Sequence, residues 1–297
     1  MPVIQEFEAS LRRCSPAQCG QWRTVDLHNH SPSSHDFRGN KDTALDDAIA
    51  HLSAKPVDVV MFTDHHKLPD AEFVAELSKR SGRTILRGTE LNVFVDAWSK
   101  PKPKVEKQAF FHLLVGFDPE QDADYWFGHL KRECGHEERD VSGKETHGLT
   151  ASIPDICNAL EQANALIIPA HLHKKSDAFK SRSVDDIYSD PEFLKLAKEH
   201  FTALEVTDLR TAELFDGEHA ETGRLLKTCI RSSDAHEVTG IGERVTWVQM
   251  ESPAFSELKA GLEIPSRVSL VPPAVPASYV IGICSATIRV RSERRSG

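Results

Sequence analysis

The chain has 297 residues, of which 39% are hydrophobic and 27% are charged, and its formal net charge is −9 at pH 7. This composition is typical of a soluble globular protein, and the acidic balance argues against a domain that coats duplex nucleic acid, which needs a basic surface. We expect a cytoplasmic protein with no membrane span, because no long apolar run, export signal or Cys-x-x-Cys pair occurs.

From residue 24 onward, β-rich apolar runs alternate with stretches that have helical periodicity. Strands are expected at 24–28, 57–66, 84–94, 109–117, 166–171, 203–209, 229–236 and 244–250. Helices are expected at 42–55, 69–82, 119–134, 151–165, 190–201, 218–228 and 252–262. The polar segments 95–108 and 135–148 interrupt this alternation and are expected to be surface loops.

The alternation predicts parallel β-α-β units, and seven or eight such units favour a closed or distorted barrel over an open sheet. The predicted fold class is therefore α/β, with a barrel domain at residues 24–264 after an N-terminal extension at 1–23. Residues 265–297 begin as a Pro-rich linker. They continue either into the start of a truncated second domain or into a disordered tail.

Imidazole and carboxylate side chains occur on successive predicted strands, most of them at the C-terminal end. They are His28, His30, His65, Glu90, His112, His171, Asp234 and His236. In a barrel these strand ends share one face, where barrel enzymes place their chemistry. Burying so many ionisable groups together is costly unless cations compensate. The pattern therefore predicts a metal site rather than ordinary packing.

The kind of ligand limits the metal and its chemistry. Imidazoles and carboxylates without thiolates suit zinc, manganese or iron. About nine candidate ligands are too many for one ion, since a catalytic zinc usually takes three from the protein. We therefore expect two or three divalent ions. Clustered divalent ions lower the pKa of a bridging water and stabilise charge on a phosphoryl oxygen, which is the chemistry of phosphoester hydrolysis.

Six segments carry a resemblance to a known family. "DLHNHSPSSHD", "FTDHH", "GTE", "FHLLVGF", "PAHLH" and "SSDAH", in this order, resemble the successive motifs of the PHP (polymerase and histidinol phosphatase) family over roughly residues 24 to 250. The resemblance implies a distorted (β/α)7 TIM-like barrel with a trinuclear metal centre. It implies one ion at His28, His30, Glu90 and Asp234, a second at Glu90, His112 and His171, and a third at Asp36, His65 and His236. The implied catalytic set is His28, His30, Glu90, Asp234 and His236.

The sequence departs from the family pattern at two places. Asp36 stands where the family often has His, and His35 precedes it. Either residue could bind an ion, and the spacing favours Asp36. Leu172 replaces the usual proline after the "AH" motif and leads into a histidine and two lysines, which we expect to alter the substrate rim.

The first functional interpretation is a metal-dependent phosphoesterase acting on a nucleic-acid end, single-stranded nucleic acid or a nucleotide. The alternatives are a histidinol-phosphatase-like enzyme for small monoesters and a non-catalytic, metal-stabilised regulatory domain. The chain also resembles PHP domains that precede SMC-like ATPases in longer proteins. It has no GxxxxGK[ST] loop, so nucleotide hydrolysis is not predicted.

Cationic side chains near the predicted strand ends are candidates for holding substrate phosphate, with Arg210 favoured because a guanidinium offers paired donors. They are Arg210, Lys174, Lys175 and Lys67, and the Lys-rich stretch 100–107 could guide nucleic acid or simply be solvated. Three acidic residues could orient ligands or be structural, namely Asp64, Glu205 and Asp208. His129, His136 and His147 are expected at the surface.

Overall fold

The structure is a computed structural model that describes residues 21–94, 110–141, 144–172 and 191–273. Several sequence predictions lie outside these ranges. They concern most of the N-terminal extension, the lysines of the 95–108 segment, Lys174 and Lys175, and the end of the chain from residue 274.

The centre of the molecule is one large sheet beside a short two-stranded ladder. The large sheet contains, in spatial order, β11 (Val268–Ser269), β10 (Thr246–Met250), β1 (Gln21–Asp26), β2 (Val59–His65), β3 (Thr84–Phe94), β4 (Phe110–Gly116) and β7 (Leu166–Pro169). The ladder joins β8 (Leu204–Glu205) to β9 (Cys229–Ile230) in parallel. Strands β1, β2 and β3 are parallel, whereas β4 is antiparallel to both of its neighbours.

Isolated bridges join the ladder to the large sheet on both sides. A parallel bridge between Leu172 and Val206 links the chain after β7 to the chain after β8. A second parallel bridge, between Asn29 and Ala235, links the chain after β1 to the chain after β9. The described strands β1, β2, β3, β4, β7, β8 and β9 therefore form a ring in this order. This arrangement agrees with the predicted distorted (β/α)7 barrel, in which β4 is the reversed strand.

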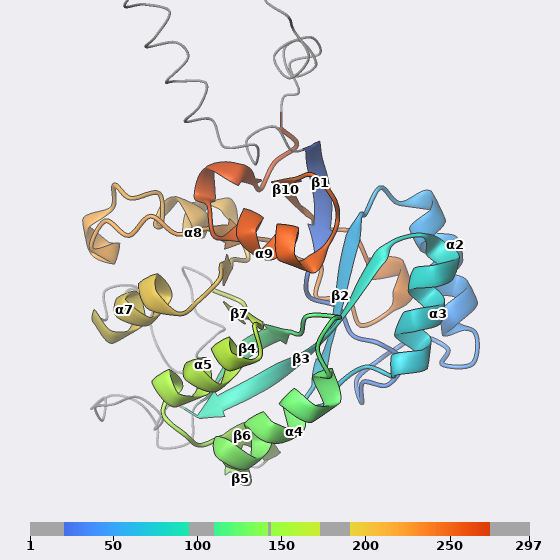
Figure 1. Cartoon of the computed structure of the whole chain (residues 1–297), viewed down its shortest axis with the longest axis horizontal. Coiled ribbons are helices and arrows are strands. Elements are labelled where there is room, and N and C mark those ends of the chain that lie inside the picture. The colour runs from blue at the N-terminus through green and yellow to red at the C-terminus, as the bar shows by residue number, and fades with distance from the viewer. Residues whose placement is uncertain (1–20, 95–109, 142–143, 173–190, 274–297) are drawn as a thin grey trace, which may run out of the picture.

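Helices cover the outside of the ring (Figure 1). They are α2 (Ala44–Ala54), α3 (Ala71–Ser81), α4 (Ala123–Glu133), α5 (Ile153–Gln162), α7 (Pro191–Glu199), α8 (Leu209–Glu213) and α9 (Phe255–Leu262). Figure 1 shows α2 and α3 side by side on one flank and α7 and α8 on the opposite flank. Within the described residues, no helix combines the length and apolar character needed to cross a membrane.

Local sequence sets where the helices begin and end. The Asp70 carboxylate accepts a hydrogen bond from the backbone N–H of Phe73 at 2.8 Å, which satisfies a free donor in the first turn of α3. Gly82 ends the same helix in the left-handed region, with φ of 68°, as the sequence predicts. The helix is therefore delimited by its own capping residues.

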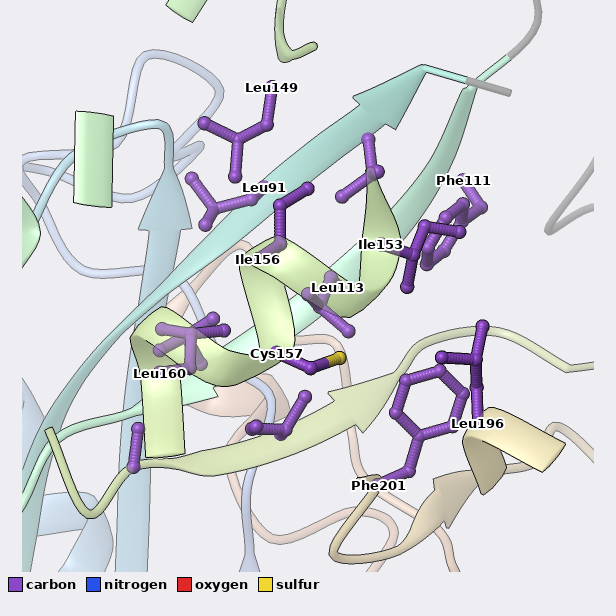
Figure 2. Close-up of a cluster of buried hydrophobic side chains, with 14 of the residues drawn as sticks. Leu91, Phe111, Leu113, Leu149, Ile153, Ile156, Cys157, Leu160, Leu196 and Phe201 are labelled. Carbon is purple, nitrogen blue, oxygen red and sulfur yellow. The ribbon is translucent and has the colours of Figure 1, made fainter. Parts of the chain in front are cut away.

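The largest hydrophobic cluster packs α5 against the barrel strands (Figure 2). The buried side chains of α5 repeat at helical spacing, namely Ile153, Ile156, Cys157 and Leu160. Figure 2 shows them facing Leu91 of β3 and Leu113 of β4, and both of these leucines are fully buried. Close packing on this side holds β3 and β4 in place, and these two strands carry Glu90 and His112 of the candidate site.

Two predicted elements differ in the structure. The helix expected at 218–228 is reduced to the 3₁₀ turn η3 (Ala220–Thr222), because Gly223 and Arg224 both have φ of 59°, which a right-handed helix cannot contain. The loop expected at 135–148 is largely a hairpin of β5 (His136–Val141) and β6 (Lys144–Leu149). Its polar residues lack the apolar alternation that reveals a strand in a sequence.

Candidate metal centre

The carboxylate of Glu90, on β3, lies at the centre of a group of imidazoles and is only 1% exposed. Its Oε1 lies 2.5 Å from Nδ1 of His112 and 3.3 Å from Nε2 of His171. Its Oε2 lies 3.2 Å from both Nε2 of His28 and Nδ1 of His65. Burial alone would raise the pKa of Glu90, but His112 and His28 outweigh it and hold the pKa well below its usual range. Glu90 is therefore an anion whose two oxygens face different histidines.

Asp36 organises a second group of imidazoles. Its Oδ2 lies 3.0 Å from Nε2 of His65 and 2.7 Å from Nε2 of His236, and Ser34 donates a hydrogen bond to its Oδ1 at 2.6 Å. The ring of His30 stacks on that of His236, with centroids 4.2 Å apart. Burial opposes ionisation of Asp36, but the Ser34 hydrogen bond and the histidines lower its pKa to about 2. The second group is therefore also anchored by a carboxylate anion.

Asp234 faces the two histidines of the His28-Asn29-His30 segment. Its Oδ1 lies 3.4 Å from Nε2 of His28 and 3.3 Å from Nε2 of His30. The Nε2 atom of His30 is buried and has hydrogen-bond geometry with no group of the described residues. Buried imidazole nitrogens normally have a partner, so an unsatisfied nitrogen aimed at a carboxylate oxygen is what a shared metal ion would explain.

All nine sequence-predicted ligands converge in the structure. Their ligand atoms fall into four overlapping groups, each with all atoms within 4.8 Å of one another: His30, Asp36, His65 and His236; His28, His171 and Asp234; His28, His30 and Glu90; and His65, Glu90 and His112. The donors are nitrogen and oxygen only, which fits zinc, manganese or iron. The shared members of these groups fit more than one ion.

Backbone conformation at the strand ends helps to aim two of these side chains. His171 and Asp234 have φ of 57° and 54°, a region that residues other than glycine seldom adopt. Hydrogen bonds hold both, since the N–H of Asp234 donates to the carbonyl of His28 at 2.8 Å and the N–H of His171 donates to Glu205 at 3.1 Å. Such unfavourable backbone is typical of functional sites.

Glu205 sets the orientation of His28, a role that the sequence left open. Both carboxylate oxygens of this buried residue lie 3.1 Å from Nδ1 of His28. Burial alone would raise the pKa of Glu205, but the facing His28 outweighs it, so the pKa is lowered. A carboxylate can only accept, so Nδ1 of His28 donates to Glu205, while Nε2 faces Glu90 and Asp234. Burial alone would lower the pKa of His28, but the facing carboxylates of Glu205, Glu90 and Asp234 outweigh it and hold the pKa well above its usual range.

Asp64 and Asp208, the other two acidic residues considered for orienting ligands, make other contacts. Asp64 does not contact His65 through its carboxylate and instead accepts from the backbone and hydroxyl of Ser31, each at 2.6 Å. Asp208 caps helix α8 by accepting from the N–H of Thr211 at 2.8 Å. Asp64 therefore fixes the loop after β1, and Asp208 has a structural role.

Asp26 is a supporting residue that the sequence interpretation missed. It is fully buried at the end of β1 and accepts from the N–H of Ser233 at 2.9 Å and from the N–H of Gly242 at 2.8 Å. Burial raises its pKa to about 6. These bonds hold both ends of the loop that carries Asp234 and His236. In the sequence, the signal for this role is an aspartate within a predicted apolar strand.

The remaining candidates lie around the cluster or outside the described residues. His35 is exposed and belongs to none of the converging groups, although its ring centroid is 5.2 Å from that of His65. Lys67 and Arg210 are exposed after β2 and on α8, and their role in phosphate binding stays a prediction. His136 is not a free surface residue, because its Nε2 accepts a hydrogen bond from Nδ1 of His66 at 3.2 Å.

Comparison with known proteins gives a likeness in fold. No protein-family model and no curated protein sequence matches the chain. One similar solved structure is Endonuclease Q in complex with a 27-mer duplex substrate with an abasic lesion at the active site, with a TM-score of 0.53, 15% identity and 84% of this chain covered. Another is a two-domain protein from Bacteroides vulgatus containing a predicted PHP-like metal-dependent phosphoesterase, with a TM-score of 0.52, 14% identity and 84% of this chain covered.

At this identity the likeness establishes the fold and nothing further. The chain spans 58% of the Endonuclease Q chain and 64% of the Bacteroides chain. The fold is thus a distorted α/β barrel like that of PHP-like proteins, as the sequence predicts. The likeness in fold does not extend the ligands or substrates of those proteins to this chain.

Proposed function

We propose that this protein is a metal-dependent phosphoesterase of the PHP type. The observation that carries the proposal is the convergence of nine imidazole and carboxylate side chains at one mouth of the barrel, centred on buried Glu90. Imidazole nitrogens and anionic carboxylate oxygens are ligand atoms that fit divalent ions. In barrel enzymes, the residues of the active site usually come from the ends of several strands at one face of the barrel.

The proposed ligands are those that converge, namely His28, His30, Asp36, His65, Glu90, His112, His171, Asp234 and His236. Two or three bound zinc, manganese or iron ions would supply an activated water and stabilise charge on the phosphoryl group. Glu205 holds the proton of His28 on Nδ1, so that Nε2 is available as a ligand atom. His236 is held similarly, with Nδ1 3.0 Å from the carbonyl oxygen of Asp234 and Nε2 facing Asp36.

We further propose a nucleic-acid end or nucleotide as the substrate. The similarity in fold to Endonuclease Q, which is bound to DNA in its structure, supports this class over a small monoester. The complete ligand set supports activity over a purely regulatory role. Attachment to an SMC-like ATPase stays a prediction from the sequence resemblance.

Metal analysis and a substrate panel test the proposal. Purified protein is analysed for bound metal and assayed with manganese on p-nitrophenyl phosphate, bis-p-nitrophenyl phosphate and labelled single-stranded DNA. We expect bound divalent metal and hydrolysis of a diester or DNA, and loss of both metal and activity in His30→Ala. Activity on the monoester alone would indicate a histidinol-phosphatase-like enzyme. Full metal loading with activity on none of the substrates would indicate the non-catalytic role.

A further inference from the structure

A polar cavity of about 380 Å³ lies beside the ligand cluster, along the loop that follows β9. Its lining includes Arg38, Asp234, His236, Glu237, Glu243 and Arg244. This volume falls within the range of about 300–1,000 Å³ that is typical of small-molecule sites. Asp234 and His236 belong both to this cavity and to the ligand cluster. A substrate group in the cavity would therefore be a direct neighbour of a group held at the cluster.

The charges around the cavity favour an anion. Arg38 and Arg244 are exposed, and neither guanidinium makes an ion pair with a carboxylate of the described residues. The carboxylate of Glu243, which also lines the cavity, is paired with Lys55 at 2.6 Å. Of the three carboxylates that line the cavity, Asp234 is a candidate ligand and Glu243 is paired with Lys55, which leaves Glu237 as the carboxylate with neither role.

The backbone that carries both arginines is held in place. The N–H of Arg38 donates to the carbonyl of His236 at 2.7 Å. The N–H of Arg244 donates to the hydroxyl of Ser233 at 3.0 Å, and the N–H of Ser233 donates to buried Asp26. These bonds fix the backbone of both arginines, while the side chains stay exposed to solvent. Because the backbone is already held, binding of a ligand has to order only the side chains.

We propose that Arg38 and Arg244 form a subsite for a second phosphate group of the substrate, next to the phosphate that reacts at the ligand cluster. The proposal rests on the proposed function and narrows its substrate class to molecules with two neighbouring phosphates. A guanidinium binds a phosphate through paired, charge-assisted hydrogen bonds, which a neutral group cannot provide. Oligonucleotides and nucleoside bisphosphates share this chemistry, whereas a monoester lacks the second anion.

The test removes the charge from each side of the contact in turn. The full chain, loaded with manganese, is titrated with a fluorescent oligothymidylate and with the same oligomer carrying neutral methylphosphonates at alternate linkages. Thymidine 3′,5′-bisphosphate and thymidine 5′-phosphate are compared by competition. The variants are Arg38→Ala, Arg244→Ala and the two Lys replacements. Arg132→Ala, an exposed arginine on α4, is the matched control. Hydrolysis of the same ligands is followed in parallel.

We expect wild type and the control to prefer the all-phosphate ligand by about tenfold or more. Each Ala variant should lose this preference, and the Lys variants should keep part of it. Equal losses on both ligands would mean that the arginines act through the fold, and unchanged preference would mean that they do not bind phosphate; either result overturns the subsite. Discrimination between the two thymidine phosphates without discrimination between the oligomers would assign the subsite to a small bisphosphate.

The proposed function and the subsite can fail separately. Hydrolysis with no preference for a second phosphate would keep the phosphoesterase and refute the subsite. Preferential binding with no hydrolysis of any ligand would keep the subsite and refute the phosphoesterase.

Discussion

Replacing Glu205 by Gln tests whether the orientation of His28 governs metal binding. The Glu205 carboxylate faces Nδ1 of His28 with both oxygens at 3.1 Å and accepts from the N–H of His171 at 3.1 Å. Gln has nearly the same shape, but its amide group can donate a hydrogen bond to Nδ1. The proton of His28 then moves to Nε2, the atom that faces Glu90, and this nitrogen can no longer bind an ion.

The expected cost follows from this contact. Loss of an orienting partner lowers metal affinity by about 10–100-fold, which corresponds to about 1.4–2.7 kcal/mol. Glu205→Ala should add a loss of folding stability of about 1–3 kcal/mol, because the partly buried N–H of His171 is left without its acceptor. Metal affinity is measured by competition with a chromophoric chelator, and stability by thermal denaturation of the metal-free protein.

Glu213→Gln is the matched control, since Glu213 is exposed on α8 and is absent from the converging groups. Its metal affinity should equal that of wild type. If Glu205→Gln keeps full metal affinity with an intact fold, the reasoning about the tautomer of His28 is refuted.

Three further predictions concern the ligand choice, the core and the thiols. Asp36→Ala should lower the amount of bound metal while His35→Ala leaves it unchanged, because only Asp36 lies among the converging groups; metal analysis of both variants decides, and the opposite pattern would make His35 the ligand. Leu160→Ala should cost about 2–5 kcal/mol in urea denaturation, because this side chain is 1% exposed in the α5 cluster; a cost below about 1 kcal/mol would contradict the packing. Burial raises the pKa of the Cys157 thiol to about 12, so a thiol reagent at pH 8 should label it only after unfolding, and labelling of Cys157 in the native protein, located by peptide mapping, would refute its burial.

The convergence of the nine side chains could be predicted from residue type and position, whereas their binding of metal stays a prediction. His28, Glu90 and His171 stand on or just after apolar runs that can only be buried strands, so a barrel must bring them to one mouth. The spacing favours Asp36 over His35, and the coordinates bring Asp36 but not His35 into the converging groups, while which of them binds metal stays a prediction.

The supporting residues were harder to predict. Glu205 and Asp26 sit in strands where a carboxylate has many uses, and only their contacts with His28 and with the loop after β9 show what each does. The hairpin β5–β6 and the short turn at 220–222 were missed for a related reason. Backbone pairing and left-handed residues shape both segments, and neither leaves a periodic apolar pattern.

The closure of the ring through isolated bridges has a mechanical consequence. The ladder of β8 and β9 is two residues long, whereas β2 and β3 pair over seven positions. Local opening of the native fold should therefore begin at the β8–β9 ladder. Glu90 lies on the strongly paired side of the barrel, and Asp234 follows β9 on the weakly paired side. A cation bound by both carboxylates would hold these two sides of the barrel together. The stability of the barrel would then depend on the bound metal.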